Sequence, residues 1–318
     1  MALCRLYSTR RMARTTMSTL VNPEDRSLKP RSWDEMIGQD KLKSKLQLIS
    51  NHAAVNNERL EPTLLIGPPG TGKSSLAALV AQEAGLNFLD LMITPDFKMA
   101  TINRVLMEHQ GLLFLDEIQN MQKKSQYYIY NVLQENEIRL DNGKCIPIEN
   151  QISIVAATTD PQKLNDALVT RFDKLRFGDY SEEELSRIVA MLATRLKLKH
   201  TKGQCEALGR ASAGSPRQAR QLVKMANRLG SMSTEDILDM CEITADGLTE
   251  DHMAYLESLY KLGGTSGVEN LSNHSLRSKD EILSIEKLLV KREFVEIAKK
   301  GRTLMMPGLK ALKNERRI

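Results

Sequence analysis

The chain has 318 residues and a net charge of +5, and this length is too great for one small domain and suits two or three. Its 41% hydrophobic and 27% charged residues exclude wholesale disorder, and no apolar run approaches the length that crosses a bilayer. The four cysteines are dispersed without a CxxC pair and the five histidines lack a ligand spacing, which excludes a disulfide framework and a zinc finger and favours the reducing cytoplasm.

The charge is unevenly distributed along the chain. Residues 287–318 carry ten lysines and arginines against three acidic residues, whereas residues 1–23 carry four arginines and no acidic residue. The remainder is therefore acidic. A mildly acidic body with a basic C-terminal end predicts a localised contact with a polyanion.

Residues 1–26 predict a disordered basic arm that contributes no core. Their Arg/Ser/Thr-rich composition resembles an organellar transit peptide, whereas a start at Met12 or Met17 would leave only a short arm.

A phosphate-binding loop is the strongest motif. Residues 63–66 predict an apolar strand. The segment GPPGTGKS follows this strand, and a helical Ser/Leu/Ala stretch comes next. This is the G-x-x-x-x-G-K-S pattern in its strand–loop–helix context. The backbone N–H groups of such a loop surround the β-phosphate of ATP, Lys73 can reach the β- and γ-phosphates, and the Ser74 hydroxyl can ligate Mg²⁺. The predicted nucleotide-binding residues of this loop are Gly67, Pro68, Pro69, Gly70, Thr71, Gly72, Lys73, Ser74 and Ser75.

A second strand ends in two carboxylates. The run LLFLDE at 112–117 is continuously apolar before its acidic end, as expected for a parallel strand that is buried on both faces. At the edge beside the phosphate loop, Asp116 can hold the magnesium ion through water, and Glu117 can orient and deprotonate the attacking water. Two acids at a strand end are often only surface residues, but their pairing with the phosphate loop favours catalysis.

Two further segments predict groups that respond to the γ-phosphate. The strand 152–157 ends in Thr158, Thr159 and Asp160, where a polar side chain would lie near the γ-phosphate. Arg171 follows near the end of the next helix. In a ring of subunits such an arginine can reach the neighbour's nucleotide, although Arg171 alone would more often be a surface ion-pair partner.

These motifs together resemble the AAA+ ATPases and, more closely, the RuvB family of Holliday-junction branch-migration motors. The segments KPRSWDEMIGQ, GPPGTGKSSLA, LFLDEI, AATT, TRF and AGSPR follow in RuvB order, and the resemblance covers about residues 27–313. The segment AATTDPQKL alone would equally suit a clamp-loader subunit.

The resemblance implies roles for residues that the patterns alone do not assign. It implies that Thr159, or else Thr158, senses the γ-phosphate, that Arg171 acts as a finger in trans, and that Arg217 is a second sensor from the lid. It also implies a homo-oligomeric ring, expected to be a hexamer. The residues implied to pack on the adenine are Met36, Ile37, Tyr180 and Pro216.

The chain after residue 177 changes to helical patterns. A capped helix from 181 to about 198 and helices near 202–212, 215–230 and 233–245 predict a small all-helical lid over 178–247. The connection at 177–180 is a plausible hinge, because the lid must respond to the nucleotide.

Residues 248–318 predict a winged-helix domain. Helices near 249–262, 268–274 and 278–289 precede two expected strands, 292–298 and 303–306, which are joined by a basic turn. This order resembles the RuvB C-terminal domain. Lys299, Lys300 and Arg302 would then lie at the wing tip and contact DNA phosphates, the alternative being a solvated basic turn.

One segment departs from the family pattern. RuvB proteins dock the junction-binding partner RuvA through a longer hairpin before the sensor strand, whereas Asn142-Gly143 within 137–148 predicts a tight turn and a shorter hairpin. A requirement for a RuvA-like partner therefore stays open.

The expected fold is α/β, with a P-loop AAA+ core over 27–177, the helical lid and the winged-helix domain. The expected function is an ATP-driven, ring-forming motor that translocates duplex DNA and migrates four-way junctions, without a membrane partner. One alternative is a clamp-loader-like switch, but clamp loaders end in a helical collar. The other is an ATP-regulated DNA-binding protein with little turnover, which would need neither Glu117 nor Arg171.

Overall fold

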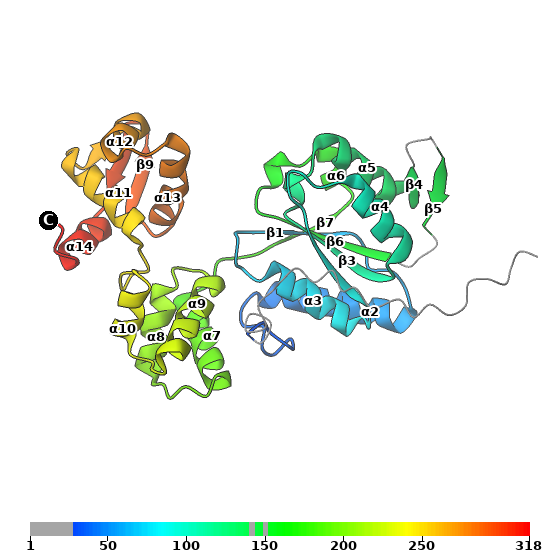
Figure 1. Ribbon diagram of the computed structural model, residues 1–318, viewed down its shortest axis with the longest axis horizontal. Coiled ribbons are helices and arrows are strands. Elements are labelled where there is room, and N and C mark those ends of the chain that lie inside the picture. Colours follow the sequence, from blue (N-terminus) through cyan, green and yellow to red (C-terminus); the bar gives the residue numbers. More distant parts are fainter. Residues whose placement is uncertain (1–27, 140–143, 149–151) are drawn as a thin grey trace, which may run out of the picture.

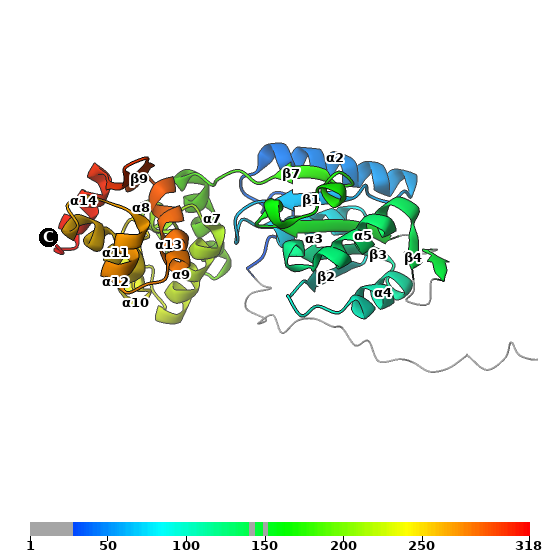
Figure 2. The same ribbon diagram turned by 90° about the horizontal axis from the view of Figure 1, so that it is seen from above.

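The computed structural model describes residues 28–139, 144–148 and 152–318. The predicted basic arm at 1–26 lies outside these described residues. No helix within the described ranges is both long and apolar enough to cross a membrane. The core occupies one side of the molecule, and the lid and the C-terminal domain lie together on the other side (Figures 1 and 2).

The core is built on a five-stranded parallel sheet in the described part of the chain, with the order β2-β3-β6-β1-β7. Because all strands run in the same direction, their carboxyl ends meet at one edge, and the loop after β1 emerges there between the ends of its neighbours. This edge is where the sequence patterns place the nucleotide. The strands are β1 (Thr63–Ile66), β2 (Phe88–Met92), β3 (Gly111–Asp116), β6 (Ile152–Thr158) and β7 (Asp173–Arg176).

Helices cover both faces of this sheet (Figure 1). Successive residues of β1 point to opposite faces, so that Leu64 and Ile66 pack into one apolar cluster and Leu65 into another. Helices α2 (Asp40–Asn56) and α3 (Lys73–Glu83) supply the cluster around Leu65. The opposite cluster receives α4 (Met99–Glu108), α5 (Lys123–Glu135) and the short α6 (Asp166–Val169). Burial on both faces explains why β1, β3 and β6 read as continuous apolar runs.

Short elements complete the core. The turns η1 (Ile118–Asn120) and η2 (Pro161–Lys163) follow β3 and β6 at the edge where the strands end. Strands β4 (Glu137–Arg139) and β5 (Cys145–Pro147) form a separate antiparallel pair, with Ile138 opposite Ile146. The two strands of the expected hairpin therefore pair, while its predicted Asn142-Gly143 turn lies outside the described residues.

The lid consists of α7 (Glu182–Arg195), α8 (Lys202–Ala211), α9 (Pro216–Leu229) and α10 (Thr234–Met240). A capping box begins α7, because the Ser181 hydroxyl accepts the backbone N–H of Glu184 at 3.1 Å and the Glu184 carboxylate accepts that of Ser181 at 2.8 Å. The apolar face of α7 is buried in the lid's own core. The lid is therefore a separate packed unit, joined to the core by the chain around Phe177–Tyr180.

The C-terminal domain alternates helices and strands. Its elements are α11 (Glu250–Lys261), β8 (Thr265–Ser266), α12 (Val268–Ser275), α13 (Lys279–Lys291), β9 (Val295–Ala298), β10 (Gly301–Leu304) and α14 (Met306–Asn314). The strands form one sheet in the order β8-β10-β9.

The structure corrects the sequence-based prediction of this domain at several places. The glycine-rich segment 263–267 contains β8, which pairs with β10, and the chain continues through Pro307 into α14. Strand β10 also begins at Gly301, two residues earlier than predicted, so that the turn contains only Lys299 and Lys300. A proline in the first turn of a helix is compatible with helix formation, because it removes no intrahelical hydrogen bond there.

Candidate nucleotide site and DNA-binding surface

The phosphate loop contains two glycines whose backbone conformation disfavours other residues. Gly70 and Gly72 have φ angles of 79° and 100°, which residues with a side chain rarely adopt. A Cβ on Gly70 would also lie 2.6 Å from Cβ of Arg217, a residue of the lid. The loop is therefore shaped both by its own turn and by the close approach of the lid.

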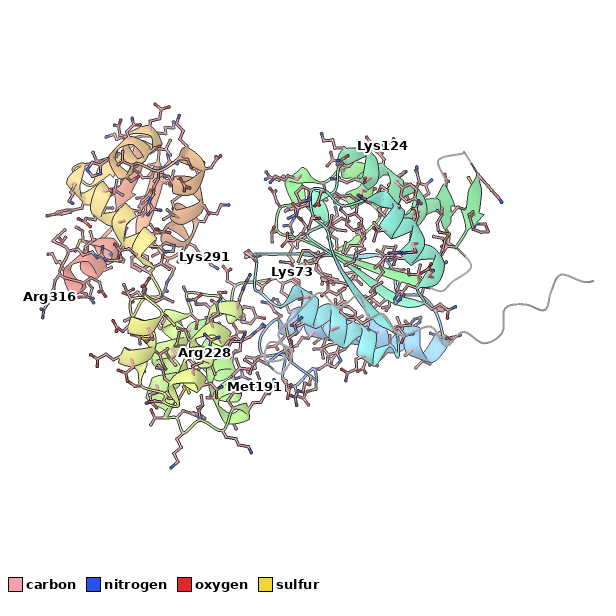
Figure 3. All side chains as sticks on the ribbon, viewed as in Figure 1. Lys73, Lys124, Met191, Arg228, Lys291 and Arg316 are labelled. Carbon is pink, nitrogen blue, oxygen red and sulfur yellow. The ribbon has the colours of Figure 1, made fainter. Side chains whose placement is uncertain are left out.

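Lys73 lies at the start of α3, on the side of the core that faces the lid (Figure 3). Its ammonium group donates hydrogen bonds to the carbonyl oxygens of Gly67 at 2.8 Å and Pro68 at 2.9 Å. Burial lowers the pKa of Lys73, and the nearby carboxylates of Asp116 and Glu117 oppose this shift. These contacts hold a cation beside the loop at the place where phosphate oxygens would bind.

Asp116 ends β3 in a strongly acidic environment. Burial raises its pKa to about 6, and the carboxylates of Asp90 and Glu117 add to the shift, while Lys73 and the backbone N–H of Glu117 oppose it. A divalent cation would relieve this repulsion. Within the described ranges, no group of three or more His, Cys, Asp or Glu side chains could hold a metal alone. Asp116 and Ser74 line the same cavity, and their carboxylate and hydroxyl oxygens are the kind of ligand that Mg²⁺ binds.

Glu117 contacts Thr159, the residue that directly follows β6. The Thr159 hydroxyl donates to Oε2 of Glu117 at 2.9 Å, whereas Thr158 is fully buried and its hydroxyl donates to Oε1 of Gln119 at 2.7 Å. Between the two sensor candidates, Thr159 therefore makes the direct contact with Glu117. Sequence reasoning did not identify Gln119, because nothing in the linear pattern indicates that it meets residues about forty positions away.

One cavity of about 400 Å³ brings most of the phosphate-site residues together. It is lined by Lys73, Ser74, Asp116, Glu117 and Arg217, and by the loop residues Pro69, Gly70, Gly72 and Ser75. Lys29, Arg220, Gln221 and Lys224 also line it and were not predicted. A signal for the lid residues was present, since positions 217, 220, 221 and 224 recur on one face of α9.

The residues expected to contact the adenine lie on the other side of the loop. Met36, Ile37, Tyr180 and Pro216 line a second cavity, together with Thr71 and Gly72. The Tyr180 hydroxyl donates to the carbonyl oxygen of Thr71 at 3.0 Å. The cavity volume of about 40 Å³ has room for only a few water molecules. A purine base is larger than this volume, so residues that line the cavity would have to move apart to admit it.

Arg171 is exposed and lies in the turn after α6. Its guanidinium donates to Oε1 of Gln134 at 2.7 Å and to the Tyr130 hydroxyl at 3.3 Å, and it lies 5.2 Å from the centre of the Tyr130 ring. In the described part of the chain, Arg171 lines neither of the two cavities beside the phosphate loop.

The predicted DNA contacts divide into two groups. Lys299 and Lys300 are exposed on the turn between β9 and β10. Arg302 instead forms an ion pair with Glu286 of α13, at 2.9 and 3.0 Å, and its side chain is only 16% exposed. The expectation that Arg302 lies at the wing tip is therefore wrong. Because β10 begins at Gly301, Arg302 is a strand residue whose side chain points to α13.

Comparisons with known proteins match both ends of the chain to one family. The family model described as the Holliday junction DNA helicase RuvB P-loop domain matches residues 28–176, and that of the RuvB C-terminal winged helix domain matches residues 245–313. The structure described as the Thermotoga maritima RuvB Holliday junction branch migration motor is similar, with 26% identity and a TM-score of 0.75. The match covers 90% of this chain and 98% of that chain. Two mutants of the same protein match with 26% identity and TM-scores of 0.75 and 0.76.

Proposed function

The chain belongs to the RuvB family of Holliday-junction branch-migration motors, and we propose that it hydrolyses ATP with Mg²⁺ and couples this hydrolysis to translocation of duplex DNA. The observation that carries the proposal is one cavity in which Lys73 and Glu117 of the core face Arg217 of the lid. A site divided between two bodies can convert a change at the γ-phosphate into a movement of the lid.

The chain's residues have distinct tasks in hydrolysis. Lys73 neutralises the β- and γ-phosphates, and the backbone N–H groups of the loop bind the β-phosphate. Ser74 and Asp116 would hold Mg²⁺, which supplies charge neutralisation on the phosphate oxygens when bound. Glu117 orients the attacking water and accepts its proton, and Thr159 contacts the γ-phosphate.

We further propose that the active form is a homo-oligomeric ring, most simply a hexamer. Arg171 is exposed and lies outside its own cavity, which supports a role in the nucleotide site of the adjacent subunit. An arginine of this kind stabilises charge in the transition state and raises the rate by about 10³ to 10⁵ in enzymes where it has been measured.

The connection between the lid and the C-terminal domain supports coupling to DNA. Lys291, at the end of α13, forms an ion pair of 2.5 Å with Asp179, which directly precedes Tyr180 (Figure 3). Arg292 donates to the carbonyl oxygen of Asp246 at 2.5 Å. A movement of the lid would therefore carry the C-terminal domain, with Lys299 and Lys300, along the DNA.

The proposed DNA substrate is a four-way junction or duplex, contacted at the phosphates by Lys299 and Lys300. A RuvA-like protein is a proposed partner at the β4–β5 hairpin, although the pattern at 137–148 indicates a shorter hairpin than the RuvA-docking one. The clamp-loader alternative is disfavoured by the β8-β10-β9 sheet of the C-terminal domain, which a helical collar does not contain.

Measuring ATP turnover with a four-way junction, with linear duplex and without DNA separates the alternatives when branch migration is scored in the same samples. The proposal predicts turnover that DNA stimulates, together with ATP-dependent migration. Stimulation without migration, whether or not a RuvA-type protein is present, would favour a switch. Negligible turnover under all conditions would favour a DNA-binding protein that ATP only regulates.

A further inference from the structure

Gln119 connects the ends of two strands behind the nucleotide cavity. Its amide nitrogen donates hydrogen bonds to Oε2 of Glu117 and to the Thr159 hydroxyl, the latter at 2.9 Å. Its amide oxygen accepts the hydroxyl proton of Thr158 at 2.7 Å. Every polar atom of this side chain is thus directed either at the proposed base or at one of the two sensor candidates.

The chemistry of these partners fixes the orientation of the amide. An ionised Glu117 carboxylate only accepts hydrogen bonds, so the NH₂ group of Gln119 must face it. Thr158 accepts the backbone N–H of Asp160 at 3.1 Å, which leaves its own proton for the amide oxygen of Gln119. A flipped amide would place an oxygen against a carboxylate. The network therefore has one satisfied arrangement.

The turn that carries Gln119 is itself fixed in place. Ile118 is fully buried, and the Asn120 side chain donates to the carbonyl oxygen of Ile93, just after β2, at 3.1 Å. Glu117 adopts a left-handed conformation with φ of 55°, which is unfavourable for a residue other than glycine. Such strain persists only where the surroundings hold the residue, and Gln119 is one of the groups that do so here.

We propose that Gln119 is a positioning residue that links the sensor threonines to Glu117. The Thr159 hydroxyl has a single proton, which it donates to Glu117 at 2.9 Å. A γ-phosphate oxygen competes for that proton, and Gln119 then holds Glu117 alone in the orientation that accepts the proton of the attacking water. This inference rests on the proposed function, in which Glu117 is the base.

The inference predicts a separation of the two kinetic parameters. Gln119 does not line the nucleotide cavity, whereas Glu117 does. Methionine has a similar length to glutamine and no amide. Gln119→Met should therefore lower kcat about 10- to 100-fold, which is the scale expected from a misplaced catalytic group. The KM for ATP should stay within about two-fold of the wild-type value. Gln119→Glu keeps the shape and removes the N–H donors, and it should lower kcat at least as far.

The experiment measures kcat and KM for ATP with the full-length protein under steady-state conditions. Single-turnover reactions with the same protein give the rate of ATP hydrolysis itself. Gln122→Met is the matched control, because Gln122 is an exposed glutamine three residues away whose side chain makes no cap hydrogen bond. It should be unchanged. In a Glu117→Gln background, Gln119→Met should change the residual rate less than about two-fold, because no base is left to orient. In a Thr159→Val background, Gln119→Met should lower kcat at least as far as in the wild type, because Gln119 then holds Glu117 without Thr159.

The outcomes separate this inference from the proposed function. If Gln119→Met and Gln119→Glu have the same kcat as Gln122→Met while Glu117→Gln is inactive, Gln119 has no positioning role, and the proposed function still stands. The role of Gln119 is also overturned if Gln119→Met lowers the rate by the same factor in the Glu117→Gln background as in the wild type, or if it raises KM and leaves kcat normal. Normal turnover in Glu117→Gln instead removes the base on which both proposals depend.

Discussion

Arg302 of β10 and Glu286 of α13 form a bidentate ion pair inside the C-terminal domain, with both nitrogen–oxygen distances at or below 3.0 Å. The Tyr255 hydroxyl donates to the same carboxylate at 3.1 Å. Hydrogen bonding to Glu286 raises the pKa of Arg302, so the guanidinium stays charged. The pair holds the β9–β10 hairpin on α13, and it directs the charge of Arg302 into the domain and away from the wing tip.

We expect Arg302→Ala to loosen the hairpin without acting through DNA. Removing one partner leaves the Glu286 carboxylate buried without its counter-charge, at a cost of about 3 kcal/mol. The backbone amides of β9 and β10 should then lose roughly 100-fold in hydrogen-exchange protection. Lys300→Ala is the control and should change stability by less than about 0.5 kcal/mol. Unchanged protection in Arg302→Ala would mean that the ion pair does not support the wing.

The wing lysines should contribute affinity for DNA but no sequence preference. Replacing Lys299 and Lys300 together by Ala should lower the slope of log K against log salt by up to about two units, because each phosphate contact contributes nearly one. The loss should be similar for different duplex sequences, since phosphates carry no base information. Turnover without DNA should barely change. A salt slope equal to that of the wild type would show that the two lysines do not contact DNA phosphates and that the turn is a solvated loop.

The residues that the sequence could assign are those whose roles follow from local patterns. Lys73 and Ser74 lie in a contiguous loop, and Asp116 and Glu117 end a single apolar strand, so strand and loop signals place them directly. Arg302 was misplaced because its direction depends on where β10 begins. The start of β10 lies beside a distant strand, because Arg302 pairs with Ser266 of β8, and local patterns do not reveal this pairing.

Gln119 could not be predicted for a related reason. Its partner Thr158 ends the neighbouring strand β6 and its partner Thr159 follows that strand, so only the pairing of β3 with β6 brings them close to Gln119. The lining role of Lys224 was in principle visible, because it lies seven residues after Arg217 on the same helix. Lys29 precedes the first helix of the core and carries no periodic signal at all.

Arg171 provides a test of action between subunits. Arg171→Ala and Lys73→Ala should each be inactive alone, because one lacks the finger and the other the phosphate-binding cation. Mixing the two proteins should restore part of the hydrolysis, since some interfaces then pair an intact Arg171 with an intact Lys73. Absence of recovery at every mixing ratio, with mixed oligomers demonstrated, would contradict action in trans.

Glu117→Gln should separate binding from hydrolysis. The amide keeps the size of the carboxylate but cannot accept the proton of the attacking water, so turnover should fall at least about 100-fold. Binding of ATP, followed with a fluorescent analogue, should remain close to that of the wild type because Lys73 and the loop are intact. A variant that hydrolyses ATP at the normal rate would show that another group activates the water.

The most direct test of the central claim uses a labelled four-way junction with a mobile core. Its conversion into two duplex products is measured with and without a RuvA-type protein. The account predicts product that requires hydrolysable ATP, that disappears with Glu117→Gln, and that falls in proportion to DNA affinity when Lys299 and Lys300 are replaced. ATP hydrolysis without junction conversion under either condition, or equal conversion by wild-type protein and Glu117→Gln, would contradict a motor driven by hydrolysis at this site.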